Sequence, residues 1–501
     1  MHTVTLKLET PAWQEKELGK RFAVMCRIHN ILVKHAIELL YKLEHDADYQ
    51  NLLAAYRELH NKNSLAKDER ERVKELSGQM QDIRKNIGLT EYGLQAYIKT
   101  CGKRYKKSVS SEQVQKEATR VYRGVEKVLF GNGKRLHYKK QRDFTCISGK
   151  SNKNGVRFYP ERHAVTWNGM EIRCKYPKNK NAFSYTMESL GHGISYCDVK
   201  REMFPNGWHY YVAICLKSDP PPRKGMSAGN GVTGIDIGTS AIAAVSDNSV
   251  LLQELAEGSR KYEKQMRKLQ RSIGRSLRNA NPERFNPDGT VKKGIRKKWN
   301  LPKTCRKNKN RLASLYRKRS AFILQSHREL LNRMLPESNA FVLEDMSFAA
   351  LARRKKTLER QAKPSIINGK AVYKYKRKKR FGSSMARHAP ALFVKELKEK
   401  CRRYGKQLYK TDTRSFKASQ YSHVTGGFTK TTLKERWKVI DGHKVQRDLY
   451  SAFLLQNTES SLQHADQEKC MQNFNRFLQM HDICIRNMME QGTTMKQCFG
   501  F

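Results

Sequence analysis

The chain has 501 residues and a formal net charge of +52, from 99 Lys and Arg against 47 Asp and Glu. An ordinary metabolic enzyme is excluded as the default, because so large a charge repels itself in a compact fold unless a polyanion neutralises it, and nucleic acid is the common polyanion. A hydrophobic fraction of 38% excludes wholesale disorder. The length predicts about three folding units.

Cysteine usage and the lack of long apolar runs indicate an intracellular protein. Eleven cysteines occur at irregular spacing and none forms a C-x-x-C pair, which is typical of reduced thiols rather than of a disulfide framework. The segment from Met1 to Pro11 lacks the apolar stretch of a signal peptide, and no run of about 18 apolar residues exists. We therefore expect a cytoplasmic protein with no membrane partner.

The first part of the chain predicts one strand and then a helical domain. Apolar and polar residues alternate from Val4 to Leu8, which indicates a strand within residues 1–10. Thr10 followed by Pro11 is typical of an N-cap and a first helical position, so a helical domain is expected over residues 11–134. Its clearest helices are expected from Ser64 to about Lys85 and from Ser111 to about Leu129.

Residues 135–218 predict a small β-domain. Short β-type runs are separated by Asn-Gly turns at 154–155, 168–169 and 206–207, and the last of these sits between two runs as in a hairpin. The strand within residues 1–10 is assigned to the same β-domain. Three prolines after Asp219 then predict a linker over residues 219–230.

Residues 231–411 show a sequence pattern typical of an α/β domain. Strands are expected at Val232–Gly238, Ala241–Ser246, Phe341–Leu343 and Gln407–Lys410, with a helix near Pro390–Tyr404 before the last strand. A basic helical insertion occupies about residues 260–335. A helix over residues 447–456 and a tail over residues 457–501 with an amphipathic helix complete the chain. The tail is expected to pack on the α/β domain, although a protein-binding role is an alternative.

Three carboxylates stand at the ends of these elements: Asp236, Glu344 and Asp448. Taken singly, they fit a turn, a helix cap and a surface ion pair. Taken together in a chain of this charge, they fit phosphodiester hydrolysis by two Mg²⁺ ions, which prefer carboxylate oxygens held by separate elements of a rigid sheet. Gly234 and Gly238 are interpreted as leaving room beside Asp236 for a nucleic-acid backbone.

The motifs around these acids resemble a known family. The order G-I-D-I-G-T, V-L-E-D-M-S and R-D-L-Y-S-A-F is similar to the split RuvC nuclease of TnpB, the RNA-guided nuclease of bacterial insertion sequences, and of its descendants, the compact type V CRISPR effectors. The resemblance implies a multidomain α+β fold, in which a helical recognition domain and a small β-barrel-like wedge domain precede an RNase H-like (RuvC) α/β nuclease domain. It also implies that Asp236, Glu344 and Asp448 are the catalytic, Mg²⁺-binding residues, with Mn²⁺ as a substitute.

Two departures from the family pattern bear on the site. Ser422 and Thr425 stand where the family has cysteines, so residues 412–446 are expected to form a zinc-finger-like insertion without zinc, packed by Tyr421, Phe428 and Trp437. His423 is interpreted as a solvated or core histidine rather than a lone ligand. The third motif has Tyr-Ser-Ala in place of Asn-Ala-Ala, which leaves Asp412 and Asp441 as rivals of Asp448.

Residues 260–320 contain 22 Lys or Arg and three acids, and the basic residues of their first part follow helical spacing. We name as the basic face Lys264, Arg267, Lys268, Arg271, Arg275 and Arg278. The opposite side carries apolar residues: Met266, Leu269, Ile273 and Leu277. The apolar side is expected to pack on the protein and the basic face to contact a nucleic-acid backbone. A solvated charged face is the plainer interpretation.

Residues 351–380 hold 13 basic residues and one acid, Glu359. Tyr373 and Tyr375 alternate with lysines there and are candidates for stacking on the bases of a single strand. An exposed hairpin around Asn368-Gly369 is an equally good interpretation.

The sequence therefore predicts an RNA-guided DNA endonuclease of the bacterial cytoplasm, associated with the nucleoid. Its partners would be double-stranded target DNA and a guide RNA, either one transposon-encoded RNA or a CRISPR RNA with a partner RNA. An RNA-guided repressor without cleavage and an unguided RuvC-like nuclease or transposase are the alternatives. The repressor would require a broken set of acids, and the unguided enzymes have no use for a large N-terminal part.

If the basic face contacts phosphates, binding of guide RNA must weaken with salt, and each lost contact should reduce the log–log salt slope by about 0.7–0.9. Replacing Arg267, Arg271 and Arg275 by Gln should flatten the slope of RNA binding measured between low and moderate salt. An unchanged slope would assign this face to solvent.

Overall fold

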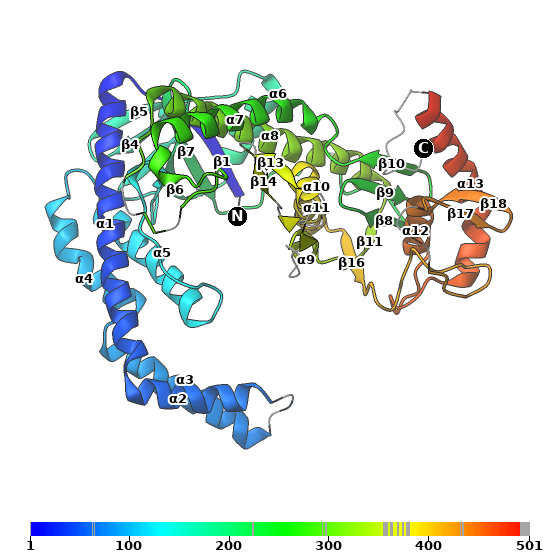
Figure 1. The fold of residues 1–501 in the computed structure, drawn as a ribbon, viewed down its shortest axis with the longest axis horizontal. Helices are drawn as coiled ribbons and strands as arrows, with labels where there is room; N and C mark the ends of the chain where they lie inside the picture. The colour runs from blue at the N-terminus through cyan, green and yellow to red at the C-terminus, as the bar shows by residue number, and fades with distance from the viewer. Residues whose placement is uncertain are drawn as a thin grey trace. The chain divides into compact units, whose positions relative to one another are not determined.

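The computed structural model describes residues 2–490 apart from 63, 65, 223–224, 293, 296–297, 354–358, 361–363, 368–369, 373–374, 377–380, 431 and 433–434. The chain is a multidomain α+β protein that divides into two compact units, Met1–Pro221 (unit 1) and Pro222–Phe501 (unit 2) (Figure 1). Among the helices of the described residues, none is long and apolar enough to cross a membrane.

Unit 1 is built on a seven-stranded sheet in the order β2-β6-β7-β1-β5-β4-β3, in which every pair of neighbours is antiparallel. The strands are β1 (His2–Glu9), β2 (Cys146–Ser148), β3 (Val156–Tyr159), β4 (Ala164–Trp167), β5 (Met170–Lys175), β6 (Ile194–Phe204) and β7 (Gly207–Leu216). The first strand lies inside the sheet, because it pairs His2 with Leu216 of β7 and Lys7 with Lys175 of β5. The predicted hairpin is confirmed as β6–β7.

The α-helices in the described part of unit 1 are α1 (Ala12–Glu44), α2 (Ala47–His60), α3 (Lys67–Asn86), α4 (Glu91–Arg104), α5 (Ser111–Leu129) and α6 (Lys180–Leu190). The prediction for α5 is confirmed, with Ser110 as its N-cap. The N-cap predicted for α1 is wrong by one residue. Pro11 is extended (φ −66°, ψ 163°) and takes the N-cap position, while the Thr10 hydroxyl donates to the Glu15 carboxylate at 3.3 Å.

The helices and the sheet of unit 1 share one hydrophobic core, in which α1 and α5 contribute beside β-strand residues. A buried cation, Arg201, lies in this core between Phe22 and Trp208, with its guanidinium carbon 4.4 and 4.2 Å from the two ring centres. It donates to the Phe144 carbonyl at 3.0 Å. Burial removes the water around the guanidinium group of Arg201, and contacts with two aromatic faces and a carbonyl oxygen compensate for that loss.

Unit 2 contains a five-stranded sheet in the order β10-β9-β8-β11-β16. The strands are β8 (Val232–Ile237), β9 (Ala241–Val245), β10 (Val250–Glu254), β11 (Ala340–Glu344) and β16 (Gln407–Thr411), which confirms the four strands predicted for this region. The first three strands are antiparallel, whereas β11 runs parallel to both β8 and β16. Helix α11 (Pro390–Tyr404) has the predicted bounds and leads into β16.

Helices cover both faces of this sheet. Ile235 and Ile237 of β8 point into a core shared with α8 (Lys303–Met334) and α11. Ala243 of β9 and Val342 of β11 belong to a second core with α12 (Arg447–Gln456) and α13 (Gln467–Glu490). Because side chains alternate along a strand, Gly234 and Asp236 lie on the α12 face.

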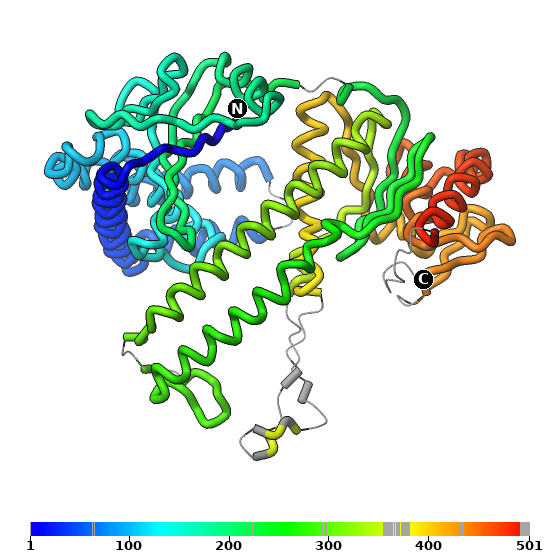
Figure 2. The backbone as a smooth tube through the Cα atoms, turned by 90° about the horizontal axis from the view of Figure 1, so that it is seen from above, coloured from blue at the N-terminus to red at the C-terminus, as the bar shows by residue number. Residues whose placement is uncertain are grey.

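Helix α7 (Glu263–Ala280) packs along α8 to form a long hairpin that leaves the sheet (Figure 2). Gln270 donates to the Tyr316 hydroxyl at 2.8 Å across this pair. Two short helices, α9 (Phe348–Ala352) and α10 (Gly382–His388), also belong to unit 2. Three short antiparallel strand pairs are β12 (Glu359–Arg360) with β15 (Tyr375–Lys376), β13 (Ser365–Ile367) with β14 (Lys370–Val372) and β17 (Trp437–Ile440) with β18 (His443–Gln446). The 3-10 helices of the described residues are η1 (Gln141–Asp143), η2 (Pro160–Arg162), η3 (Ser259–Tyr262), η4 (Pro282–Arg284) and η5 (Leu335–Glu337).

Gly234 has a different role from the one predicted. A Cβ atom at this position would lie 2.0 Å from the Ala452 carbonyl oxygen and 2.3 Å from the Gln456 nitrogen, both in the backbone of α12. The glycine therefore lets α12 approach β8 and leaves no room for nucleic acid. At Gly238 a Cβ would meet only the Ala241 carbonyl, at 3.5 Å, so this glycine does border open space.

We expect Gly234→Ala to destabilise unit 2 by about 1–3 kcal/mol, because the added methyl group overpacks a contact between two backbones. Thermal unfolding followed by circular dichroism measures this change. Gly238→Ala is the matched control and should unfold within about 0.5 kcal/mol of the wild type. Equal melting temperatures for the two variants would contradict the assigned role of Gly234.

Candidate active site

The parallel pairing of β8 with β11 brings two of the predicted acids together. Leu343 of β11 lies opposite Ile235 of β8, so the next residues along the two strands are Glu344 and Asp236. Both side chains therefore project from the same face of the sheet at the carboxyl ends of parallel strands, where open α/β sheets usually bind ligands. This is the face covered by α12.

The third acid comes from the first turn of α12. Gln446 is the N-cap, and its side chain accepts a hydrogen bond from the Leu449 N–H at 2.8 Å. Asp448 thus stands at the helix N-terminus, where the helix dipole favours an anion. Asp236, Glu344 and Asp448 line one cavity of about 550 Å³, together with Gly238, Thr239, Ser240, Thr413, Ser419, Arg436, Arg447 and Ser451.

Burial raises the proton affinity of two of the acids, and neighbouring charge adds to the effect at one of them. Burial raises the pKa of Asp236 well above its ordinary value, and the nearby charges of Asp448 and Glu344 raise it further. Burial also raises the pKa of Glu344, against a hydrogen bond that the Ala418 N–H donates to it at 3.1 Å. Negative charge in this cavity is therefore costly until a cation compensates it.

Two arginines partly compensate that charge, and sequence reasoning missed them as members of the site. Arg436 lies 3.3 Å from one Asp448 oxygen, and Arg447 lies 3.2 Å from the other. Arg447 is buried and also donates to the carbonyls of Thr432 and Glu435 at 3.2 and 2.9 Å. The adjacent Arg447-Asp448 pair was the available sequence signal, and its interpretation as a surface ion pair is wrong because both residues border the cavity. No comparable signal pointed to Arg436.

The donor set suits Mg²⁺ or Mn²⁺, since three carboxylates of one cavity offer hard oxygen ligands. Within the described residues, however, no three acidic, histidine or cysteine side chains are grouped closely enough to hold an ion as they stand. Both Asp448 oxygens are paired with Arg436 and Arg447, so Asp448 would have to exchange these partners to ligate an ion.

The two rivals of Asp448 lie elsewhere. Asp412 is exposed and accepts a hydrogen bond from the Arg414 N–H at 2.8 Å, as in a turn. Asp441 is exposed in the tight turn between β17 and β18, with φ 49° followed by 74° at Gly442. Neither residue lines the cavity that Asp236 lines.

The insertion over residues 412–446 is packed by aromatic residues. Tyr421 contacts Phe428 with ring centres 5.3 Å apart, and Trp437 meets His481 edge to face at 6.3 Å. His423 is a core histidine. It is buried, its Nδ1 lies 2.8 Å from the Tyr450 hydroxyl, and burial lowers its pKa.

The structure orients α7 as its spacing predicts. All six residues of the basic face are exposed, while Met266 and Ile273 are buried and Leu269 and Leu277 half-buried on the opposite side. Glu263 at the start of the helix pairs with Arg267 at 3.0 Å. Tyr373 lies outside the described residues. For Tyr375 only the backbone is described, in β15.

Comparison with known proteins finds structural likeness without sequence relatives. No protein-family profile and no curated protein matches the chain. Among solved structures, a Cas12f1–sgRNA–target DNA complex matches at 11% identity and a TM-score of 0.43, over 92% of this chain and 99% of that chain. A CRISPR-Cas12f ternary complex matches at 10% and 0.28, over 89% and 82%. The mini-RNA-guided endonuclease CRISPR-Cas_phi3 matches at 12% and 0.30, over 59% and 56%.

The raised pKa of Asp236 predicts a pH-dependent stability of the metal-free protein. The folded state binds the proton of the Asp236 carboxyl more tightly than the unfolded chain does. The contribution of Asp236 to the free energy of unfolding therefore falls as pH rises from the ordinary pKa of an aspartate toward the pKa of Asp236 in the folded state. In EDTA at pH 8, Asp236→Asn should therefore melt higher than the wild type, by about 2–4 °C for each kcal/mol of repulsion removed.

The gain from Asp236→Asn should shrink toward pH 5, where the wild-type carboxyl regains its proton. Asp412→Asn is the control at an exposed position and should change little at either pH. A variant at position 236 that melts no higher than the wild type at pH 8 would contradict the crowding of charge in the cavity.

Proposed function

We propose that this chain is an RNA-guided DNA endonuclease that cuts target DNA at the cavity of Asp236, Glu344 and Asp448. The observation that carries the proposal is the convergence of these three acids from two parallel strands and one helix onto one cavity. Acids in this arrangement, distant in sequence and otherwise repelling one another, are explained by metal-assisted hydrolysis better than by a structural role.

The topology of unit 2 supports an RNase H-like (RuvC) domain. Three antiparallel strands are followed by two strands parallel to the first, and the strand order in the sheet is 3-2-1-4-5 when the strands are numbered along the chain. In this arrangement the first and fourth strands are neighbours, and each carries one of the acids at its carboxyl end, Asp236 as the second-to-last residue of β8 and Glu344 as the last residue of β11. The α12 helix then brings the third acid to the same edge.

In this proposal Asp236, Glu344 and Asp448 would hold Mg²⁺, which would supply activation of the attacking water and compensation of charge on the leaving oxygen. The other roles belong to the chain itself. The main chain at Gly238 leaves space beside Asp236, and Ala418 orients Glu344 through its N–H group. Arg436 and Arg447, released from Asp448, remain beside the cavity as donors for a phosphate group.

The charge of the chain supports nucleic-acid partners. The six exposed cations of the basic face lie on one side of α7, and Glu263 is the helix's one acid. Guide RNA and double-stranded DNA are the partners that fit this surface and the net charge of +52. The guide would select the target by base pairing, and unit 1 would hold the RNA.

Alanine variants test the proposal with matched controls. Asp236→Ala and Asp448→Ala should reduce cleavage of both strands of guide-matched DNA by at least about 10³-fold, as loss of a catalytic metal ligand should, while RNA and target binding persist. Asp412→Ala and Asp441→Ala should cut like the wild type. Cleavage is measured with Mg²⁺, with Mn²⁺ and with EDTA, and the EDTA reaction should be inactive.

Cleavage by Asp236→Ala would refute the nuclease site. Cleavage by Asp448→Ala together with an inactive Asp412 or Asp441 variant would replace the third acid. Equal cleavage after ribonuclease treatment would favour an unguided nuclease, and guide-dependent binding without any cleavage by the wild type would favour a repressor.

A further inference from the structure

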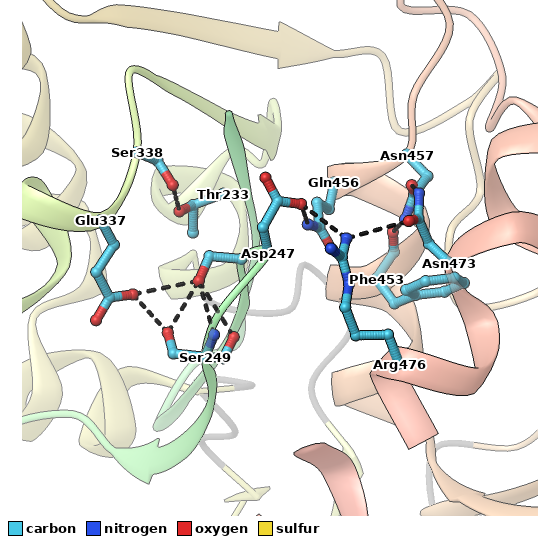
Figure 3. A network of polar contacts seen from close by, with 11 residues as sticks. Thr233, Asp247, Ser249, Glu337, Ser338, Phe453, Gln456, Asn457, Asn473 and Arg476 are labelled. Carbon is cyan, nitrogen blue, oxygen red and sulfur yellow. Dashed lines mark hydrogen bonds and ion pairs between the residues drawn. The ribbon is translucent and has the colours of Figure 1, made fainter. Parts of the chain in front are cut away.

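Helix α13 holds the C-terminal end of α12 through a polar network (Figure 3). Arg476 of α13 and Gln456 of α12 both donate to the same oxygen of Asp247, at 3.1 and 2.9 Å. Asn473 of α13 donates to the side chain of Asn457, which follows α12, at 2.8 Å. The far end of α12 is thereby tied both to α13 and to the loop between β9 and β10.

Another contact with α13 holds the N-terminal end of α12. His481 is only 1% exposed, and its Nε2 accepts a hydrogen bond from the Gln446 backbone N–H at 3.0 Å. Gln446 is the N-cap of α12, and its side chain accepts from the Leu449 N–H. Asp448 lies between Gln446 and Leu449, in the first turn of α12, which their hydrogen bond fixes.

The bond to Gln446 requires one form of the imidazole. Because Nε2 accepts a hydrogen bond, the ring proton must be on Nδ1. Nδ1 lies 2.8 Å from the Asp482 carboxylate and donates a hydrogen bond to it. Burial also lowers the pKa of His481, which favours the neutral ring that this geometry needs. Asp482, His481, Gln446 and Leu449 therefore form a continuous chain of hydrogen bonds from the surface to the first turn of α12.

We propose that His481 is a positioning residue for the metal site: it fixes the first turn of α12 and thereby the place of the Asp448 carboxylate. The inference rests on the function proposed above. Asp448 must reach the cavity while exchanging Arg436 and Arg447 for a cation, so its backbone has to stay in place while its side chain moves. A bond to the helix N-cap provides this constraint without touching the reacting groups.

Without His481 the Gln446 N–H would lose its acceptor inside the protein, because Gln446 is fully buried and the imidazole that accepts from it packs against the rings of Trp437 and Phe477. A buried donor without a partner moves toward another acceptor or water, and the first turn of α12 would move with it. The expected effect is weaker metal binding, comparable with the loss of other groups that orient a metal ligand.

The test uses the full chain and three variants at pH 8. His481→Leu removes the acceptor, and His481→Gln keeps an acceptor oxygen. Ile485→Ala removes a buried side chain from the same helix and is the control for general destabilisation. Mn²⁺ binding to the protein alone is followed by electron paramagnetic resonance of the free ion, and the Mg²⁺ concentration for half-maximal cleavage and the melting temperature are measured in parallel.

We expect His481→Leu to weaken Mn²⁺ binding about tenfold and to raise the required Mg²⁺ by a similar factor, with His481→Gln recovering most of the loss. Ile485→Ala should lower the melting temperature and leave metal binding unchanged. Unchanged Mn²⁺ binding in His481→Leu would overturn the inference, and so would an equal loss in Ile485→Ala. If His481→Leu does not fold, Asp482→Ala at the exposed end of the chain takes its place, and wild-type Mn²⁺ binding by that variant would overturn the inference.

Asp236→Ala separates this inference from the proposed function. If Asp236→Ala binds Mn²⁺ like the wild type or still cleaves DNA, the proposed site itself fails. If Asp236→Ala loses both while His481→Leu keeps wild-type metal binding, only the positioning role of His481 is refuted.

Discussion

The backbone of α12 touches the backbone of β8 at Gly234, and this contact decides where the acids of unit 2 can meet. A helix normally keeps its axis about a side chain's width from a sheet, which would hold Asp448 away from Asp236. The absence of a side chain at position 234 removes that spacing. Eight of the ten residues of α12 are buried, between the sheet on one side and α13 on the other. The helix that carries a charged site residue is thus among the most enclosed elements of the unit.

The electrostatics of the cavity are the reverse of those of the chain as a whole. A protein with a net charge of +52 concentrates three carboxylates in one place, and the same two arginines that pair with Asp448 also lower the proton affinity of Asp236. The guanidinium groups reduce repulsion among the acids. They also pair with both oxygens of Asp448 and so fix the direction of that side chain.

The sequence predicted four of the five strands in the main sheet of unit 2, α11 and the amphipathic α7, because strong periodicity and proline or glycine residues at their ends mark them; it did not predict β10. The tail was correctly predicted to contain an amphipathic helix that packs on unit 2, since Phe474, Phe477 and Leu478 are buried there. The sequence did not reveal why position 234 is a glycine. The close approach that requires it is made by Ala452 and Gln456, which lie more than 200 residues later in the chain. Arg436 and His481 were also missed: their partners, Asp448 and Gln446, lie 12 and 35 residues away, and no local pattern distinguishes the two from other basic residues.

The place of β1 has a consequence for how unit 1 folds during synthesis. The strand is synthesised well before its two neighbours, which lie at residues 170–175 and 207–216. Helix α1 also emerges early, and its apolar residues belong to a core that the later strands complete. The sheet therefore cannot close until nearly all of unit 1 has been made, and α1 must keep its apolar face unburied for that interval. Such non-local pairing slows folding and leaves the apolar surface of α1 exposed to aggregation while the later strands are made.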